Sequence, residues 1–411
     1  MDMDNKYWFF LESYIYVNIK ANGILLYDTH TGTNLYVESA VAIQMVNKMY
    51  EDESLGCIEL ESSDLTDPET QDFVHKVVLN RMGELQNRHT HPVKPVILLP
   101  ILSLNLDVEK LKDKENVDLF LARDISKYLL DVNIVLNYSC RQQCPHCQSY
   151  CKQFFCCSKG CTSESLSQDS LVNLLRQISY FPVRTINVTG GDIYHYQNLE
   201  VFNTSNKDGK KVFNFYVHYL NYQENPYIDN QNIHLIINTP VNQVKLHNVY
   251  SLTKEKDVKY HLIVEDEEQY EELELTMTAL GIEDFEVHPY YNGHNIQFFE
   301  ENVYLSKEDI VAISISMREI FRNQKLNANS FGSLYILPNG DIKANLNEET
   351  IGHLGKDRII DVINHEMMQN TAWRKVRSSE PCQNCVYQYL CPPLSNYERV
   401  IHRQNLCHVI K

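Results

Sequence analysis

The cysteine residues of this 411-residue chain are crowded into two short segments, and this limits what the chain can fold into more than any other feature. Eleven of the twelve lie between Cys140 and Cys161 or between Cys382 and Cys407. The N-terminal residues, MDMDNKYWFF, are acidic where an export signal would carry lysines. We therefore expect a cytoplasmic protein with reduced thiols. Clustered thiols then indicate metal binding, and we interpret the isolated Cys57 as an ordinary structural residue.

The first cysteine group follows an apolar segment and has the spacing C-x3-C-x2-C, at Cys140, Cys144 and Cys147. Structural zinc usually takes four ligands in two separated pairs. Three thiols on one loop suit three corners of an iron–sulfur cube and leave one iron open for a small molecule. The alternative is a zinc site that takes its fourth thiol from Cys151, Cys156, Cys157 or Cys161.

The second cysteine group has the spacing C-x2-C-x5-C-x15-C, at Cys382, Cys385, Cys391 and Cys407. Four such thiols fit one zinc ion or one complete iron–sulfur cluster, and the spacing alone does not decide between them.

Strands and helices alternate around the first group. DVNIVLNY, from Asp131, is a near-continuous apolar strand of the kind buried in a parallel sheet. A helix is expected after Ser167, and further strands are expected at RTINVTGGD, NIHLIINTP, VKYHLIVED and DFEVHPY. Repeated β-then-α units predict an α/β fold with a parallel sheet, open or closed as a partial barrel, and chemistry at the carboxyl ends of its strands.

The flanking regions differ from this centre. In residues 1–95, three short strands precede a helix that Ser39 caps, which predicts a winged-helix-like module; a plain N-terminal cap on the larger domain is the alternative. Residues 96–130 are a connector with prolines and the charged stretch Asp107–Asp118. In residues 326–411, SLYILPNGDIKA predicts a hairpin turned at Asn339-Gly340.

Charge and hydropathy exclude some classes of function. The net charge of −17 argues against a basic face for nucleic acid. No apolar run is long enough to span a membrane.

From Asp131 to about Asn292 the chain resembles the radical S-adenosylmethionine (SAM) superfamily, on its three spaced cysteines and the Gly190-Gly191-Asp192 turn. The resemblance implies a partial (β/α)6 barrel over residues 131–325 and a SAM-binding [4Fe–4S] cluster. It implies that SAM contacts His146, the Gly190-Gly191-Asp192 turn, Asn238 and Glu265. An electron donor would reduce the cluster, SAM would be cleaved, and the resulting radical would remove a hydrogen from the substrate.

The second group resembles the auxiliary-cluster (SPASM or twitch-like) domain of peptide-modifying radical enzymes, here residues 326–411. That family has further cysteines around the hairpin and a fourth core cysteine where this chain has Ser395. The resemblance therefore implies one auxiliary [4Fe–4S] cluster, held by Cys382, Cys385, Cys391 and Cys407.

Over its full length the chain resembles the Bacteroidales-type "pseudo-radical-SAM" partner proteins of peptide maturation, on segments such as KYWFFLESYIYV and CKQFFCCSK. This implies maturation of a ribosomally made precursor peptide, whose leader the N-terminal module would bind, beside a second radical SAM protein. One alternative is a catalytically silent subunit that binds the precursor and supports a true maturase. A further alternative, an RNA-modifying radical enzyme, is disfavoured by the acidic charge.

Overall fold

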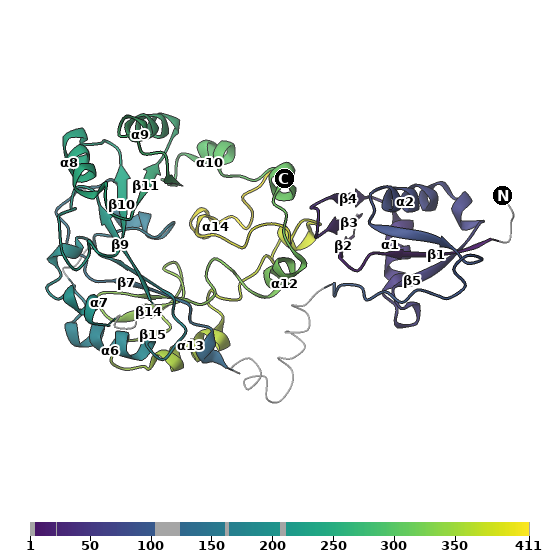
Figure 1. Ribbon diagram of the computed structural model, residues 1–411, viewed down its shortest axis with the longest axis horizontal. Coiled ribbons are helices and arrows are strands. Elements are labelled where there is room, and N and C mark those ends of the chain that lie inside the picture. The colour runs from purple at the N-terminus through teal and green to yellow at the C-terminus, as the bar shows by residue number, and fades with distance from the viewer. Residues whose placement is uncertain (1–4, 22, 103–123, 161–163, 206–210, 411) are drawn as a thin grey trace.

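The computed structural model describes residues 5–21, 23–102, 124–160, 164–205 and 211–410. Its centre is a nine-stranded sheet in the order β12-β11-β10-β9-β8-β7-β13-β14-β15 (Figure 1). The first six strands in this order run parallel to their neighbours. Their bounds are β7 (Asp131–Val135), β8 (Thr185–Thr189), β9 (Val212–His218), β10 (Asn232–Asn238), β11 (Val258–Val264) and β12 (Phe285–Pro289). The α/β class with a largely parallel sheet is confirmed, and the closure of these strands into a partial (β/α)6 barrel stays a prediction.

Four helices follow strands of this sheet: α6 (Gln168–Ile178), α7 (Glu200–Ser205), α8 (Gln243–Thr253) and α9 (Glu267–Ala279). Ser167 caps α6 as expected, because its side chain accepts a hydrogen bond from the Ser170 amide. Alternate residues of each strand, such as Ile233, Leu235 and Ile237 of β10, share one core with the buried stripes of these helices. The residues between them face the opposite side of the sheet, which we call its inner face.

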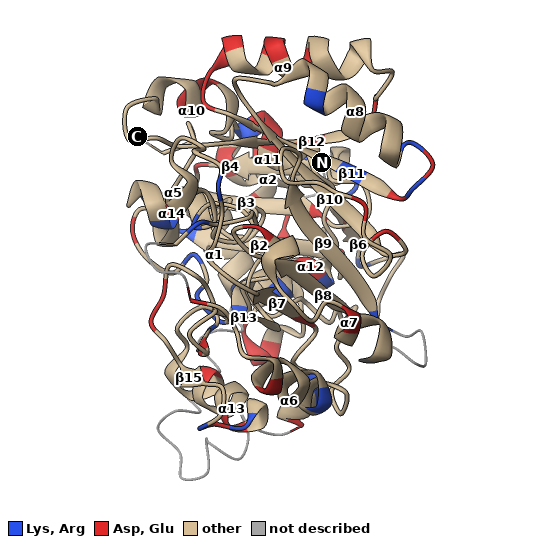
Figure 2. Cartoon of the chain, turned by 90° about the vertical axis from the view of Figure 1, so that its left-hand side faces the viewer, with Lys and Arg blue, Asp and Glu red and all other residues tan. Residues whose placement is uncertain are grey.

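Figure 2 shows acidic segments along α9, with basic and acidic segments interspersed elsewhere in that view. None of the helices in the described part of the chain is long and apolar enough to cross a bilayer.

The C-terminal hairpin continues the central sheet instead of forming a separate unit. β13 (Ser333–Ile336) pairs in parallel with β7, and β14 (Asp341–Lys343) and β15 (Gly352–His353) follow. The predicted turn at Asn339-Gly340 is confirmed, with Gly340 at a φ of 91°. The remaining helices of this part of the chain are α10 (Ile296–Asn302), α11 (Lys307–Ala312), α12 (Met317–Lys325), α13 (Ile359–Gln369) and α14 (Asn396–Ile401), of which α13 packs in the core of the central sheet.

The N-terminal module has a core of its own and contains two three-stranded antiparallel sheets (Figure 1, right). One sheet is β2 (Ile15–Lys20), β3 (Gly23–Asp28) and β4 (Asn34–Val37); the other is β5 (Cys57–Glu61), β1 (Lys6–Leu11) and β6 (Gly83–Asn87). Its helices are α1 (Ala40–Met49) and α2 (Pro68–Leu79). The three strands that were expected are β2, β3 and β4, whereas β1 was not expected and β5 and β6 pair with it. The winged-helix-like character stays a prediction, and the charged stretch Asp107–Asp118 lies outside the described residues.

The first of these two sheets packs on the second cysteine group. Tyr16 and Tyr27 share a buried cluster with Ile320, Tyr387 and Leu390. The Asn18 amide donates to the backbone oxygen of Val386 at 2.7 Å, and Lys20 Nζ donates to that of Gln383 at 2.7 Å. The N-terminal module and the second cysteine group are therefore joined directly.

Candidate functional site

The first cysteine group lies on the loop that leaves β7, at the carboxyl end of the strand. Gly190 and Gly191, which follow the neighbouring β8, hold this loop. The Gly191 amide donates to the backbone oxygen of Asn137 at 2.8 Å, and the Asn137 side chain donates to that of Asp192 at 2.9 Å. A Cβ on Gly191 would lie only 2.5 Å from the Ser139 oxygen, so glycine is required for this close approach.

Each sulfur of the group lies near at least one N–H donor. Cys140 Sγ accepts from the Gln142 amide and from Asn221 Nδ2, both at 3.4 Å. Cys147 Sγ accepts from the Lys159 amide at 3.3 Å. N–H donors stabilise a thiolate relative to a thiol, and they are one way in which proteins tune iron–sulfur clusters.

The third sulfur, Cys144 Sγ, lies 3.6 Å from His218 Nε2. Because His218 Nδ1 accepts from the Leu220 amide at 3.2 Å, Nε2 is the nitrogen that carries the proton. Burial lowers the pKa of His218 to about 4, so this ring is neutral near pH 7. The Nε2–H group of His218 therefore lies beside Cys144 Sγ at 3.6 Å, with Asn238 Oδ1 as its closer acceptor at 2.7 Å.

The sulfurs are spread more widely than one zinc ion would hold them. Tetrahedral zinc with Zn–S bonds of ~2.3 Å places its sulfurs ~3.8 Å apart. Among the described residues, the single set of three His, Cys, Asp or Glu ligand atoms within 4.8 Å of one another is His261, Glu286 and His288. In the described part of the chain, no three thiols of either cysteine group therefore lie within 4.8 Å of one another, and the metal that each group binds stays a prediction. Burial raises the pKa of Cys144 and of Cys147 to about 12, so metal binding must displace their protons.

The residues predicted to contact SAM lie at this same end of the sheet. His146, at the start of α5 (Cys147–Tyr150), has a φ of 53° and places Nε2 3.9 Å from Glu265 Oε1. Glu265 accepts from the Asn292 side chain at 2.7 Å. Asn238 Oδ1 lies 2.7 Å from His218 Nε2, which links it to Cys144.

Asp192 completes the turn after β8. Its Oδ1 accepts from the Tyr194 amide at 3.1 Å, and burial raises the pKa of its carboxyl group. The geometry thus gathers the predicted residues into one region; SAM contact itself stays a prediction for each of them.

Sequence reasoning missed β9, and with it His218 and Asn221. The segment VFNFYVH does alternate, with Phe213, Phe215 and Val217 in the core. Its inner positions are Asn214, Tyr216 and His218, so the near-continuous apolar run of a parallel strand is absent. The alternation was the signal that could have revealed this strand.

Asparagine side chains cross the inner face of five strands near their amino ends. Each amide donates to the next side chain, at 2.7–3.0 Å, in the order Asn232, Asn214, Asn187, Asn133 and Ser333. This chain of hydrogen bonds satisfies polar groups that would be costly to bury unpaired.

The chain after the first cysteine group folds back against the inner face. Phe154 stacks on His288 with ring centres 4.9 Å apart, and Phe155 meets the edge of Tyr216 at 4.6 Å. Cys156 and Cys157 are buried with their sulfurs 4.0 Å apart. We call residues 153–157 the plug. Cys151 lies beside it, with Sγ 3.5 Å from Ser158 Oγ, and Cys161 lies outside the described residues.

The second cysteine group lines one cavity with all four of its thiols, Cys382, Cys385, Cys391 and Cys407. Arg377 Nη1 lies 3.9 Å from Cys382 Sγ and pairs with Glu398 at 2.5 Å. Burial raises the pKa of the Cys382 thiol, and the Arg377 cation opposes that shift by favouring the thiolate, the form that coordinates metal. Four ligands leave no open iron on a cluster held here.

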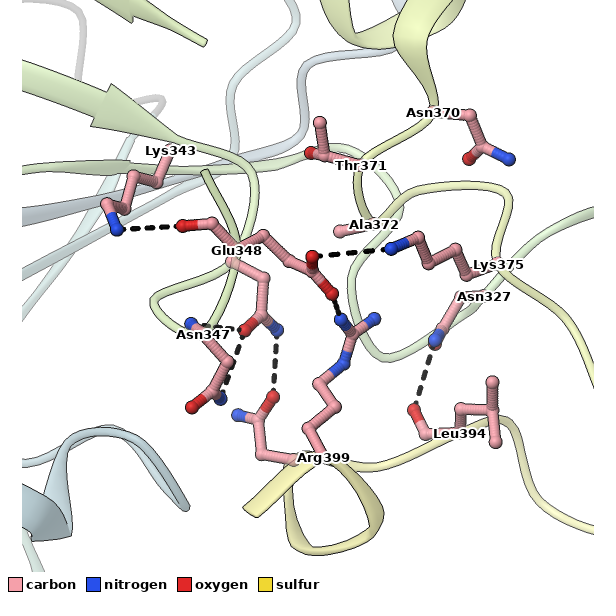
Figure 3. Close-up of polar contacts among 12 residues, drawn as sticks. Asn327, Lys343, Asn347, Glu348, Asn370, Thr371, Ala372, Lys375, Leu394 and Arg399 are labelled. Atoms are coloured by element: carbon pink, nitrogen blue, oxygen red, sulfur yellow. Dashed lines mark hydrogen bonds and ion pairs between the residues drawn. The ribbon is translucent and has the colours of Figure 1, made fainter. Parts of the chain in front are cut away.

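The hairpin region, for which the family resemblance implies further cysteines, is held by charges in this chain (Figure 3). Glu348 pairs with Arg399 of α14 and lies 3.3 Å from Lys375 Nζ. Asn347 Nδ2 donates to the backbone oxygen of Lys152, beside the plug, at 2.7 Å. Ser395 begins α14 in a capping box with Glu398. These contacts join the hairpin region to α14 and to the loop of the first cysteine group.

No model of a known protein family matches the chain, and no curated protein matches it. Among solved structures, the chain is similar to Streptococcus suis SuiB bound to its precursor peptide SuiA, with 12% identity, 97% of each chain covered and a TM-score of 0.47. The chain is also similar to SuiB bound to S-adenosylmethionine, with 12% identity, 97% of each chain covered and a TM-score of 0.46. The protein anSMEcpe with bound AdoMet gives 11% identity, 64% of this chain, 84% of that chain and 0.42. At such values the chemistry has to be derived from the residues of this chain.

Proposed function

We propose that this chain is a radical SAM enzyme that acts in the maturation of a ribosomally made peptide. The observation that carries the proposal is the arrangement of Cys140, Cys144 and Cys147. Their sulfurs lie on one loop, each beside an N–H donor, and the Gly190-Gly191 turn packs on the same loop. Three thiolates without a fourth protein ligand leave one iron of a [4Fe–4S] cluster free for SAM.

The residues have separate tasks in this proposal. A reduced cluster supplies the electron that cleaves SAM, and the radical so formed abstracts hydrogen from the substrate. The Gly190-Gly191 backbone receives the amino group of SAM, His146 packs near its adenine, and Asn238 and Glu265 contact its carboxylate or ribose. The plug, with Tyr150 and Tyr290, excludes water from the inner side of the loop.

The auxiliary cluster belongs to Cys382, Cys385, Cys391 and Cys407, and an electron donor is needed as a partner. The N-terminal module would bind the leader of the precursor. Its β2–β3–β4 sheet contacts the second cysteine group and ends in the edge strand β4, and an extended peptide can add to such an edge. A labelled precursor should bind the full chain and be displaced by its unlabelled leader segment; absence of binding would contradict this part.

The test of the enzymatic proposal is release of 5′-deoxyadenosine. The full chain is reconstituted anaerobically with iron and sulfide, then given dithionite and SAM. We expect 5′-deoxyadenosine from the native chain, none from Cys144→Ala, and native amounts from Cys151→Ser, whose thiol is not a proposed ligand. Equal traces from native chain and Cys144→Ala would contradict the proposal.

The plug favours a second candidate, the silent subunit that binds a precursor and supports a partner radical SAM protein. Phe154 and Phe155 cover the inner face, next to the first cysteine group, where a substrate of the radical would have to lie. A silent subunit would bind iron and precursor yet release no 5′-deoxyadenosine, and it would stimulate the partner. If the double variant with Phe154→Ala and Phe155→Ala releases 5′-deoxyadenosine and the native chain does not, the plug is what blocks the site.

A further inference from the structure

Three histidines lie side by side on the inner face of the sheet, one on each of β10, β11 and β12. His261 Nε2 lies 2.7 Å from His234 Nδ1, and His261 Nδ1 lies 2.8 Å from His288 Nε2. Successive rings are nearly parallel, with centres 5.0 Å and 5.1 Å apart. Neither the proposed clusters nor the SAM contacts use these histidines.

A carboxylate joins the last two of them. In the register of β11 and β12, Glu286 is directly opposite His261, and His288 is two residues further along β12 on the same face. Glu286 Oε2 lies 3.4 Å from His261 Nδ1 and 3.8 Å from His288 Nε2. Two imidazoles and one carboxylate therefore converge on one point.

We propose that His261, Glu286 and His288 bind a divalent zinc-type metal ion, at a site separate from both cysteine groups. Ligand atoms ~2.0–2.1 Å from a tetrahedral zinc are ~3.3 Å apart. The three separations here, 2.8, 3.4 and 3.8 Å, bracket that value. Three protein ligands leave a fourth position for water or another small ligand.

His234 orients this site although it is not a ligand. When His261 Nε2–H donates to His234 Nδ1, the lone pair of His261 Nδ1 faces Glu286 and His288. Tyr216 stacks on His234 at 4.3 Å and keeps that ring in place. His288 then presents the lone pair of Nε2 once its proton resides on Nδ1.

The surroundings allow an ion to enter and remain. The Glu286 side chain is 57% exposed on the edge strand β12, whereas that of His261 is 6% exposed. Burial, the two neighbouring histidines and Lys259 all lower the pKa of His261, so the imidazole is in the neutral form that binds metal. A bound ion would fasten the edge strand β12 to β11 beside Phe154 of the plug.

Zinc uptake by the full chain tests the site. Iron and sulfide are first loaded anaerobically to occupy the thiols, loosely bound metal is removed with a chelator, and zinc is then titrated. We expect one zinc per chain, with X-ray absorption showing nitrogen and oxygen neighbours at ~2.0–2.1 Å and no sulfur at ~2.3 Å. Cobalt(II) in place of zinc should show no sulfur-to-cobalt charge-transfer band.

Glu286→Gln keeps the size of an exposed side chain and removes its charge, so the variant should fold as the native chain does. Loss of a residue that only hydrogen-bonds to a metal ligand lowers metal affinity roughly 10–100-fold. Because Glu286 is itself a proposed ligand, we expect the zinc affinity of the variant to fall by at least this factor. Glu283→Gln, also exposed, is the matched control and should bind like the native chain. Zinc bound through sulfur alone, absence of uptake, or equal affinity of Glu286→Gln and native chain would overturn the proposal.

Discussion

His218 Nε2 lies 3.6 Å from Cys144 Sγ and 2.7 Å from Asn238 Oδ1, so one ring nitrogen links a proposed cluster ligand to a proposed SAM contact. The hydrogen bond that Nδ1 accepts from the Leu220 amide places the proton on Nε2, and this N–H is shared between Asn238 Oδ1 and the sulfur on which cluster charge would accumulate. This relationship makes the electronic properties of the first cluster depend on a residue 74 positions away.

The first prediction concerns the reduction potential of that cluster. His218→Met removes the N–H beside Cys144, and Asn221→Leu removes one of the two donors at Cys140. Each should lower the potential by roughly 40–60 mV, the one-electron equivalent of losing ~1 kcal/mol of preference for the reduced, more negative state. An EPR-monitored redox titration measures this. His247→Gln, on exposed α8, should leave the potential unchanged, and unchanged potentials in both test variants would show that these donors do not act on the cluster.

The second prediction uses two adjacent glycines as a matched pair. A Cβ on Gly191 would meet the backbone oxygen of Ser139 at 2.5 Å, whereas one on Gly190 meets that of Asn137 at 3.2 Å. Gly191→Ala should displace the cysteine loop and abolish iron loading at the first site. Gly190→Ala should retain most of it. The measurement is iron and sulfide per chain, and equal loading of the two variants would contradict the packing described.

The third prediction separates the two clusters. Cys391→Ala removes one of the four thiols that line the second cavity, so iron should fall from about eight to about four per chain. The remaining cluster should still respond to SAM. Cys57→Ala, at a buried cysteine outside both groups, should keep about eight. Stoichiometric zinc in the native chain that disappears in Cys391→Ala would assign the second group to zinc instead.

The fourth prediction is loss of stability in acid. Burial lowers the pKa of His234 and His288 to about 4 and that of His261 to about 3, against about 6.5 when unfolded. The unfolded chain then binds more protons as pH falls, so stability is complete above about pH 6.5 and is lost towards pH 4.

Each such histidine adds a slope of up to ~1.4 kcal/mol per pH unit in that window. His234→Gln retains an amide for hydrogen bonding and does not titrate. The slope of unfolding free energy against pH should therefore decrease by the contribution of one histidine, up to ~1.4 kcal/mol per pH unit. Urea unfolding of chelator-treated protein at a series of pH values measures it. An identical slope in the native chain and His234→Gln would show that the His234 ring titrates normally in the folded chain.

Local patterns predicted much of this structure. Ser39 was expected to cap a helix and a helix was expected after Ser167, and both serines are N-caps in the structure. The glycine pair was expected beside the cysteine loop because the carboxyl ends of neighbouring parallel strands meet at one edge, and the contact of Gly191 with Ser139 confirms that proximity.

The strands and contacts that were not predicted depend either on pairing between distant segments or on the unusual composition of one face of the central sheet. The strand β1 was not predicted. Its partners β5 and β6 were missed because they lie about fifty or more residues away from it and their own sequences, CIELE and GELQN, are weakly apolar. The inner face of the central sheet carries asparagine, tyrosine and histidine where a packed interior is usually branched and aliphatic. The pairing of those polar residues with one another becomes visible only when the strands are aligned.

The most direct test is the EPR spectrum of Cys391→Ala, reconstituted without air and reduced with dithionite, recorded before and after SAM is added. If Cys140, Cys144 and Cys147 hold a cube with one open iron, the spectrum is that of a [4Fe–4S] cluster and it changes on addition of SAM. A cubane signal that SAM leaves unaltered, or a colourless protein after full iron and sulfide loading, would contradict the account.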